Sequence, residues 1–386
     1  MTMKNNKYDI SAFYFPNFHK GDKHNEQWHG EGWTEWELMK HATPRFEGHD
    51  MPKVPLWGYE DESDAEVMEK KIRAAAEYGI TNMLFDWYWY ADGPFLNKAL
   101  DEGFLKSRNA DDIKFSIMWA NHDWDEIHPI SRAYIENPKR ELPWKISEEC
   151  FFEAIDYIIE NYFKRSNYYR IEGKLFFSIY EINKFINNFG STERCRDVIK
   201  EIRRRVKEAG LGEVHMNAIV WGTKILMGES NNSVGGKVLR DIGFDSVTSY
   251  VWIHEHAPDN FPATDYAEFR ELCEKDFARL TEKFKGIPYY PNVTCGWDPS
   301  PRTVQTDKYG DLGYPFSRIL VNNTPAEFEK ALRNVKKMLD ESDLKTKMFT
   351  VNAWNEWTEG SYLEPDTRDG YGKLEAIKKV FIETEE

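Results

Sequence analysis

The 386-residue sequence lacks several features that would place it in common functional classes. Its four cysteines, Cys150, Cys195, Cys273 and Cys295, have neither the spacing of a zinc site nor that of a disulfide framework, so we expect reduced thiols. Basic residues are outnumbered, with 51 Lys and Arg against 66 Asp and Glu. The resulting net charge of −15 argues against binding to nucleic acid or to an anionic membrane.

Long apolar stretches are missing as well. No segment is long enough to span a bilayer, and residues 1–7 carry charge but lead into no apolar signal-peptide core. We therefore expect a soluble, cytoplasmic chain; a periplasmic or secreted chain whose signal peptide had been removed would have the same sequence. No Gly/Ser linker divides the chain, and no G-x-G-x-x-G follows an early predicted strand, which argues against a doubly wound dinucleotide-binding fold.

Aromatic residues, by contrast, are abundant: the chain has 14 Trp, 20 Tyr and 24 Phe, many of them beside polar residues. Most of the Phe are expected to fill a large core. The motif Asp86-Trp-Tyr-Trp-Tyr90 is different because it combines aromatic rings with an acid. Sugars present C–H faces and hydroxyl groups, so a combination of rings and polar side chains favours a carbohydrate site.

Apolar runs alternate with amphipathic stretches along the whole chain, a pattern that predicts a parallel sheet covered by helices. The predicted strands, whose bodies are apolar, are 8–15, 80–85, 114–119, 174–180, 214–221, 246–252, 287–293 and 347–354. The predicted helices are 63–78, 94–106, 147–165, 192–209, 233–241, 265–284, 324–339 and 371–382. Eight such units predict a single (β/α)8 TIM barrel domain over residues 1–386, with a long first βα loop. Ser63 and Glu66 fit a capping box that opens the first helix, and Gly79 is expected to close it.

The active site of such a barrel lies at the C-terminal ends of its strands. Polar and aromatic residues recur there, and together they predict an enzyme that acts on a polyhydroxylated substrate. The candidate substrate-binding residues are Tyr14, Asp86, Trp87, Asn121, Trp124, Tyr180, Trp252, Trp297 and Asn355. Each also has a structural interpretation, such as loop capping for an Asn or core packing for a Trp.

The segment Asn352-Ala-Trp-Asn-Glu-Trp-Thr-Glu-Gly360 places Glu356 and Glu359 three residues apart, directly after an apolar run. Like charges repel, and partial burial beside tryptophans raises the pKa of at least one carboxyl group. An enzyme that needs one carboxylic acid and one carboxylate at neutral pH requires this arrangement. The alternative is that both are solvated acids of an acid-rich surface.

These motifs resemble those of the WbsX-like proteins, which are often labelled glycosyltransferases and belong with the glycoside hydrolase family 99-like barrels. The motifs run from about residue 8 to residue 380. They are Tyr14-Phe-Pro16, Trp28-His-Gly-Glu-Gly-Trp-Thr-Glu-Trp36, Phe46-Glu-Gly-His49, Asp86-Trp-Tyr-Trp89, Trp119-Ala-Asn121 with Trp124, Gly296-Trp-Asp298 with Pro301-Arg302, and the Glu356 segment with Leu363-Glu-Pro365. The chain departs from the pattern at His122-Asp123-Trp124, where the family has Glu-Asn-Trp, so its substrate contacts there are expected to differ.

The resemblance implies a retaining glycosidase that needs neither a metal nor an organic cofactor. Glu356 would take the proton of the sugar 2-hydroxyl, which favours a 1,2-anhydro intermediate. Glu359 would protonate the leaving oxygen and then activate water. The alternatives are a glycosyltransferase of polysaccharide synthesis, although no D-x-D metal site or basic diphosphate cradle is evident, and a non-catalytic carbohydrate-binding barrel.

Further residues have more modest roles in this interpretation. Asp86 is expected to bind a sugar hydroxyl or orient Glu356, and Tyr180 to bond to a catalytic glutamate. Glu35 lies in the first loop, which is expected to fold over the barrel mouth, and it is interpreted as part of a structural salt bridge. Arg302 is expected chiefly to hold the loop after the seventh strand, and the alternatives are pairing with a Glu or contact with an acidic sugar. His49 and His254 fit either hydroxyl ligands or surface histidines.

Overall fold

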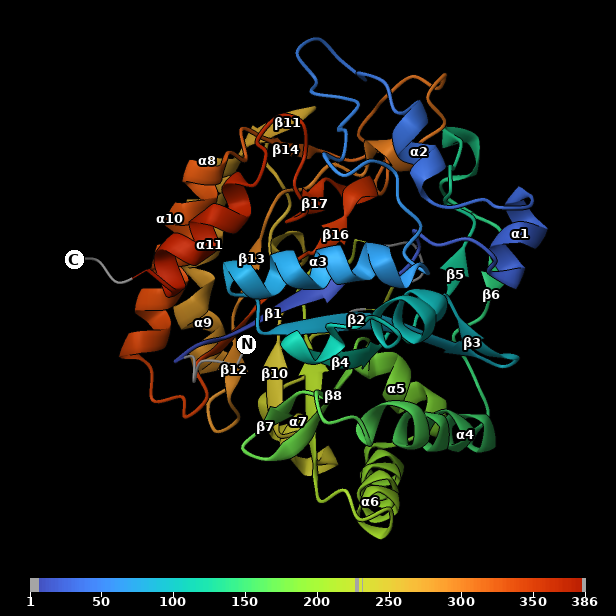
Figure 1. Cartoon of the computed structure of the whole chain (residues 1–386), viewed down its shortest axis with the longest axis vertical. Coiled ribbons are helices and arrows are strands. Elements are labelled where there is room, and N and C mark those ends of the chain that lie inside the picture. Colours follow the sequence, from blue (N-terminus) through green and yellow to red (C-terminus); the bar gives the residue numbers. More distant parts are fainter. Residues whose placement is uncertain (1–6, 226–228, 231, 384–386) are drawn as a thin grey trace.

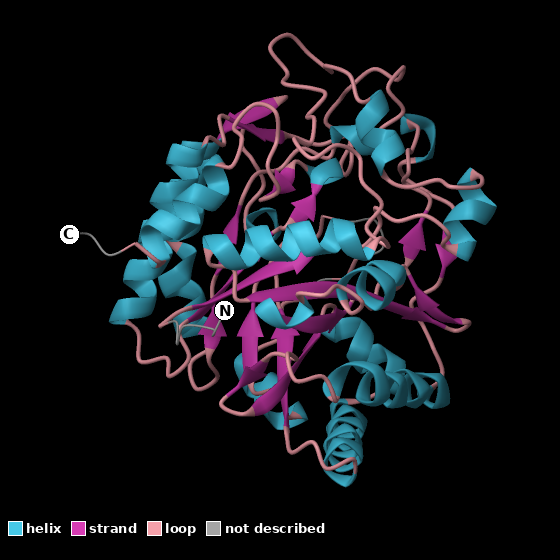
Figure 2. Cartoon of the chain, viewed as in Figure 1, coloured by secondary structure: helices cyan, strands magenta, loops and turns pink. Residues whose placement is uncertain are grey.

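A ring of parallel strands surrounded by helices forms the centre of the computed structural model, which describes residues 7–225, 229–230 and 232–383 (Figures 1 and 2). The ring runs β1 (Asp9–Tyr14), β2 (Asn82–Tyr90), β4 (Lys114–Trp119), β8 (Lys174–Ile179), β9 (Val214–Ile219), β10 (Ser246–Thr248), β12 (Tyr289–Tyr290) with β13 (Asn292–Thr294), and β15 (Met348–Asn352). Because β15 pairs with β1, the ring closes. The predicted TIM barrel is confirmed.

The seventh strand is interrupted at Pro291, between β12 and β13. β12 pairs with β10 and β13 pairs with β15, so the two short pieces together connect the neighbouring strands. Proline has no N–H to donate to the ladder, which accounts for the break. Its carbonyl still accepts a hydrogen bond from the N–H of Thr350 at 2.9 Å.

Most predicted helices are present, several with altered bounds. They are α3 (Ala65–Tyr78), α4 (Glu148–Ile158), α6 (Thr192–Glu208), α7 (Gly236–Ile242), α8 (Tyr266–Glu274) with α9 (Asp276–Lys283), α10 (Pro325–Glu341) and α11 (Gly372–Phe381). Helix α3 ends at Gly79 as predicted, with φ of 99°. Its start differs from the prediction: the cap is Asp64, whose carboxylate accepts from Glu66 N–H, while the Ser63 hydroxyl donates to Asp61.

Several helices and one strand differ from the sequence-based prediction. Residues 94–106 are not one α-helix: β3 (Gly93–Phe95) pairs with β2 and is followed by a π-helical turn over Ala99–Phe104. Helix α5 (Ile182–Phe189) directly follows β8 and was not predicted. Neither were α1 (Lys23–His29) and α2 (Trp36–His41) in the first loop, which are less than two full turns long and carry little periodic signal.

The inward face of the barrel is polar, which corrects the expectation of apolar strand bodies. Asn82 donates to Ser11 Oγ at 3.0 Å and to Ser116 Oγ at 2.8 Å. On the opposite wall Asn217 accepts from Ser178 and Thr248 at 2.8 and 3.0 Å. These small side chains satisfy one another inside the ring, so burying them leaves few unpaired polar groups.

The long first loop, residues 15–64, lies over the C-terminal end of the barrel. Figure 1 shows α1 and α2 on the side of the barrel that also carries β16 (Asn355–Glu356) and β17 (Ser361–Tyr362). The loop is held there because Glu35 accepts hydrogen bonds from Arg302 and Thr358.

No helix within the described residues combines the length and apolarity that a bilayer crossing requires.

Candidate active site

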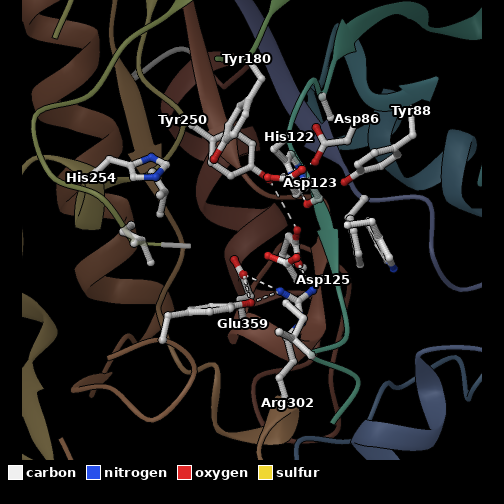
Figure 3. A pocket seen from close by; sticks show the side chains of 18 of the residues that line it. Asp86, Tyr88, His122, Asp123, Asp125, Tyr180, Tyr250, His254, Arg302 and Glu359 are labelled. Carbon is white, nitrogen blue, oxygen red and sulfur yellow. Dashed lines mark hydrogen bonds and ion pairs between the residues drawn. The ribbon is translucent and has the colours of Figure 1, made fainter. Parts of the chain in front are cut away.

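A cavity of about 780 Å³, counted out to its open mouth, lies at the C-terminal end of the barrel (Figure 3). Its walls come from the ends of β2, β4, β8 and β10 and from the loops after β13 and β15. The described lining residues are Phe15, Asp86, Tyr88, Met118, Ala120, His122, Asp123, Trp124, Asp125, Ile127, His128, Tyr180, Ile225, Tyr250, Val251, His254, Trp297, Arg302, Tyr314, Glu356 and Glu359.

A tight ribbon carries both candidate catalytic glutamates into this cavity. β16 pairs antiparallel with β17, and the 3-10 turn Trp357–Glu359 connects them. Gly360 ends the turn with φ of 66°, and a Cβ there would lie 2.7 Å from Asp298 Cβ, so the turn requires glycine. Glu356 and Glu359 are consequently buried, with 4% and 5% of their surface exposed.

Arg302 joins these two glutamates to a third acid. Its guanidinium lies 2.6 Å from Glu359 Oε1, 3.5 Å from Glu356 Oε2 and 2.8 Å from Glu35 Oε1. The predicted salt bridge of Glu35 is therefore present. The pairing of Arg302 with glutamate, one of the roles considered from the sequence, is present, and its side chain reaches into the cavity instead of only holding its own loop. Figure 3 shows it directed at Glu359.

Burial raises the pKa of both candidate catalytic carboxyls. Burial, with help from the Glu359 charge, raises the pKa of Glu356 well above its ordinary value, although Arg302 opposes this. Burial also raises the pKa of Glu359, but the close Arg302 and a 2.8 Å hydrogen bond from Tyr314 work against the increase. Carboxyl groups with raised pKa values can hold and release protons near neutral pH.

Glu35 behaves in the opposite way, since its partners outweigh its burial. Burial alone would raise the pKa of Glu35, but Arg302, His128 and the Thr358 hydroxyl bring it below the ordinary value. Glu35 and Arg302 thus form a permanent ion pair beside the two titrating glutamates.

A fourth buried carboxyl, Asp86, is linked to Glu356 through Tyr250. The Tyr250 hydroxyl lies 3.0 Å from Asp86 Oδ2 and 3.5 Å from Glu356 Oε1. Burial raises the pKa of Asp86 well above its ordinary value. Tyr180 does not make the expected bond to a catalytic glutamate; its hydroxyl donates to Glu229 Oε1 at 2.9 Å.

Of the residues singled out from the sequence, six line the cavity: Asp86, Trp124, Tyr180, Trp297, Glu356 and Glu359. One face of the Trp124 ring is covered, because His128 stacks on it with an interplanar angle of 7°. Trp297 has the Tyr314 ring beside it, with ring centroids 6.0 Å apart. His254, for which a surface position was one interpretation, is buried and also lines the cavity.

The other five singled-out residues lie outside the cavity and contact other protein groups. Tyr14 donates to Met68 Sδ at 3.3 Å, Trp87 to Tyr162 at 3.2 Å and Trp252 to the Asn292 carbonyl at 2.8 Å. Asn121 pairs through its amide with the backbone of Glu181, and Asn355 pairs in the same way with the backbone of Phe15. These contacts hold strand ends together.

His49 is buried as well and connects the first loop, through Asp298, to the turn Trp357–Glu359. Its Nε2 lies 2.8 Å from Asp298 Oδ2, and the Asp298 backbone N–H donates to the Glu359 carbonyl at 2.5 Å. This corrects the surface interpretation of His49 and gives it a positioning contact instead.

Several lining residues were not identified from the sequence, among them Tyr88, Asp125, His128 and Tyr314. Strand alternation would have found Tyr88, two positions after Asp86, and Asp125, two after Asp123. His128 and Tyr314 lie in irregular loops and have no such signal. Burial lowers the pKa of His122 to about 4 and that of His128 to about 3, so both rings are neutral hydrogen-bonding groups at physiological pH. Within the described residues no His, Cys, Asp and Glu cluster is arranged to hold a metal ion.

Comparison with known proteins gives a family, two relatives and several related structures. The family model described as "Glycosyltransferase WbsX" matches residues 10–377. "Uncharacterized protein WxcX" from two strains of Xanthomonas campestris pv. campestris is 27% identical over 382 residues, which covers 96% of this chain and 49% of the relative. The chain thus spans about half the length of these relatives.

Solved structures share the fold at low sequence identity. A "Glycoside hydrolase-like protein" superposes with a TM-score of 0.59 at 16% identity, covering 99% of this chain and 95% of the other. The GH99 endo-alpha-mannosidase from Bacteroides thetaiotaomicron in complex with bis-tris-propane superposes with a TM-score of 0.57 at 15% identity, covering 98% and 96%. At these identities the likeness establishes the barrel alone.

Proposed function

The chain belongs to the glycosyltransferase WbsX family of carbohydrate-active enzymes, and within that class we propose that it is a retaining glycoside hydrolase. It would cleave an oligo- or polysaccharide with Glu356 and Glu359, and residues 1–386 would act as one catalytic domain. The observation that carries this proposal is the pair of buried glutamates at the barrel mouth, both with raised pKa values and both within 3.5 Å of Arg302.

The reaction that fits this pair proceeds in two steps. The Glu356 carboxylate accepts the proton of the sugar 2-hydroxyl while that oxygen bonds to C1, and Glu359 gives its proton to the leaving oxygen as the C1–O bond breaks. In the second step Glu359 takes a proton from water, the water oxygen bonds to C1, and Glu356 returns the proton to the 2-oxygen as the anhydro ring opens. Two inversions at C1 give net retention of configuration.

A glycosyltransferase is the second candidate, because the family description names that activity. The charges around the cavity favour the hydrolase. Among the described lining residues, Arg302 is the one Lys or Arg, and five are acids: Asp86, Asp123, Asp125, Glu356 and Glu359. A nucleotide-sugar donor carries two phosphates that need cations. Arg302 is already engaged by three glutamates, so the lining offers a diphosphate little compensation.

The test is to incubate the protein with a panel of oligosaccharides and, separately, with nucleotide sugars plus acceptors. We expect cleavage of an oligosaccharide, with NMR showing that the first product keeps the anomeric configuration of the substrate. Glu356→Gln and Glu359→Gln should each reduce the rate by about 10²–10⁴-fold while the protein stays folded.

Two other results would refute the hydrolase. Consumption of a nucleotide sugar only when acceptor is present would establish the transferase. Saturable glycan binding without turnover in either assay would indicate a non-catalytic carbohydrate-binding barrel.

A further inference from the structure

Tyr250 lies between two carboxyl groups and has only one proton to offer them. Its hydroxyl oxygen is 3.0 Å from Asp86 Oδ2 and 3.5 Å from Glu356 Oε1. If both carboxyls were ionised, the hydroxyl could donate to one of them while its lone pairs faced the other. Both contacts are attractive only when one carboxyl brings a proton of its own.

The surroundings of Asp86 favour the presence of that proton. The side chain is buried, and none of the described residues donates a hydrogen bond to its Oδ1. An unpartnered buried oxygen costs much less on a neutral carboxylic acid than on a carboxylate. The nearby cation Arg302 does not stabilise an ionised Asp86, because its guanidinium already pairs with Glu35, Glu356 and Glu359.

We propose that Asp86 and Glu356 share one proton through the Tyr250 hydroxyl, and that Asp86 stores it while Glu356 acts as a base. In the storing form Asp86 donates from Oδ2 to the Tyr250 oxygen, and Tyr250 donates to the Glu356 carboxylate. In the other form Glu356 donates to Tyr250 and Tyr250 donates to the Asp86 carboxylate. Each of two protons shifts along one hydrogen bond, and the net result is that one proton passes between the carboxyls. The net charge of the trio stays the same, and Tyr250 never becomes an anion.

This arrangement explains how a deeply buried Glu356 can be ionised when the substrate arrives. The 3.5 Å contact is long for a hydrogen bond, but such contacts in substrate-free enzymes commonly tighten in the complex. Asp86 and Tyr250 act through Glu356 and are therefore positioning residues. Among the described residues, the other titratable or charged groups that face the trio include Tyr88 from β2, Tyr180 from the end of β8, His254 after β10, Arg302, Glu359 and Glu35.

The inference builds on the proposed hydrolase activity, and the pH dependence of kcat/KM tests it. Asn at position 86 mimics a protonated Asp, so Asp86→Asn should keep activity within about tenfold and move the acidic limb to lower pH, since Glu356 no longer shares a proton. Tyr250→Phe removes the hydrogen bonds that link the two carboxyls. Its rate should fall by about 10²-fold, and its acidic limb should move to higher pH because Glu356 loses a donor.

Tyr168→Phe is the matched control. The buried Tyr168 hydroxyl donates to the Phe176 carbonyl in the barrel wall, far from Asp86, Tyr250 and Glu356. The acidic limb of the pH profile of this variant should stay where it is in the wild type.

A second measurement needs no substrate. Infrared difference spectra between acidic and alkaline buffer detect a buried carboxylic acid by its C=O stretching band. A shared proton predicts that Asp86→Asn and Glu356→Gln each alter this band. An Asp86→Asn spectrum identical to that of the wild type, or an acidic limb that neither variant moves, would overturn the proposal. If the band behaves as expected but no glycan is cleaved, the hydrolase assignment alone has failed.

Discussion

The Arg302 guanidinium lies closer to Glu359 than to Glu356, with nitrogen–oxygen distances of 2.6 and 3.5 Å. One cation therefore influences two acids unequally, and it also neutralises Glu35. The Glu359 carboxyl receives a further hydrogen bond from Tyr314 at 2.8 Å, whereas Glu356 has the longer Tyr250 contact. The pair is chemically asymmetric before any substrate binds.

Removing the Arg302 charge should change the pH dependence of the reaction. Arg302 lowers the pKa of both glutamates, so Arg302→Gln should raise both pKa values and shift the acidic limb of kcat/KM to higher pH. We expect kcat/KM to fall by about 10²–10³-fold. Arg302→Lys keeps the charge but loses the fork geometry, so it should shift the limb less. A folded Arg302→Gln enzyme with an unmoved limb would show that Arg302 does not set these pKa values.

Substrates with different leaving groups should distinguish the roles of the two glutamates. A general acid is dispensable when the leaving group departs without a proton, so Glu359→Gln should cleave a glycosyl fluoride far better than the corresponding glycan. Glu356→Gln should lose about the same factor, roughly 10²–10⁴, on both substrates. The measurement is the ratio of kcat/KM values for the two substrates. If Glu356→Gln were the variant rescued by fluoride, the roles of the two residues would be exchanged.

Thermal stability should reveal the cost of burying Glu356. Its pKa in the folded protein is raised, so the folded state loses stability as pH rises from the unfolded pKa, about 4.3, towards the folded one. Glu356→Gln removes this loss. We expect the variant to melt about 1–3 °C above the wild type at neutral pH, and the difference to vanish below the unfolded pKa. Glu77→Gln, an exposed control, should melt like the wild type. A variant that is less stable at every pH would contradict the assignment.

A buried ion cluster behind the catalytic ribbon should be important for stability. Lys71 of α3 lies 2.5 Å from both Glu62 and Glu364, and Glu364 accepts from the Trp357 indole at 2.7 Å. Lys71→Met leaves two buried acids without their cation, which should cost about 3–5 kcal/mol of unfolding free energy.

The control for this change is its neighbour in sequence. Lys70 pairs with Glu60 but is 36% exposed, and Lys70→Met should cost less than about 1 kcal/mol. Adding Glu62→Gln and Glu364→Gln to Lys71→Met should restore much of the loss, because no buried charge then remains unpaired. Equal denaturation midpoints for Lys70→Met and Lys71→Met would contradict this account.

The barrel was predictable because most of its strands are continuous runs of residues suited to a sheet, and β4 occupies the predicted residues 114–119. Sequence motifs were less reliable for individual side chains. In the Asp86 motif, Asp86 and Tyr88 face the cavity while Trp87 points away and bonds to Tyr162. Successive side chains of a strand alternate between faces, so a motif that attracts attention as a unit divides between the site and the packing.

Contacts between distant segments were beyond sequence reasoning. The side chains of Arg302 and Glu35 meet although they are 267 positions apart in the sequence. Arg302 ends a three-residue 3-10 helix and Glu35 caps α2, and no sequence pattern pairs two such positions. The histidine at position 128 is in the same situation. Helix α5, however, has apolar residues at 182, 185, 186 and 189, and this period was available in the sequence.

The burial of Glu35 has a consequence for how a glycan enters. Segment 34–38 cannot swing aside without breaking the hydrogen bonds that the Glu35 carboxylate accepts from Asn17, Arg302 and Thr358, at a cost of roughly several kcal/mol. We therefore expect the segment to form a rigid wall of the cavity, and the sugar chain to enter through the open mouth of the cavity. Amide hydrogen exchange at residues 34–38 that is as slow as in the barrel strands would demonstrate this rigidity. Rapid exchange would show that the segment opens.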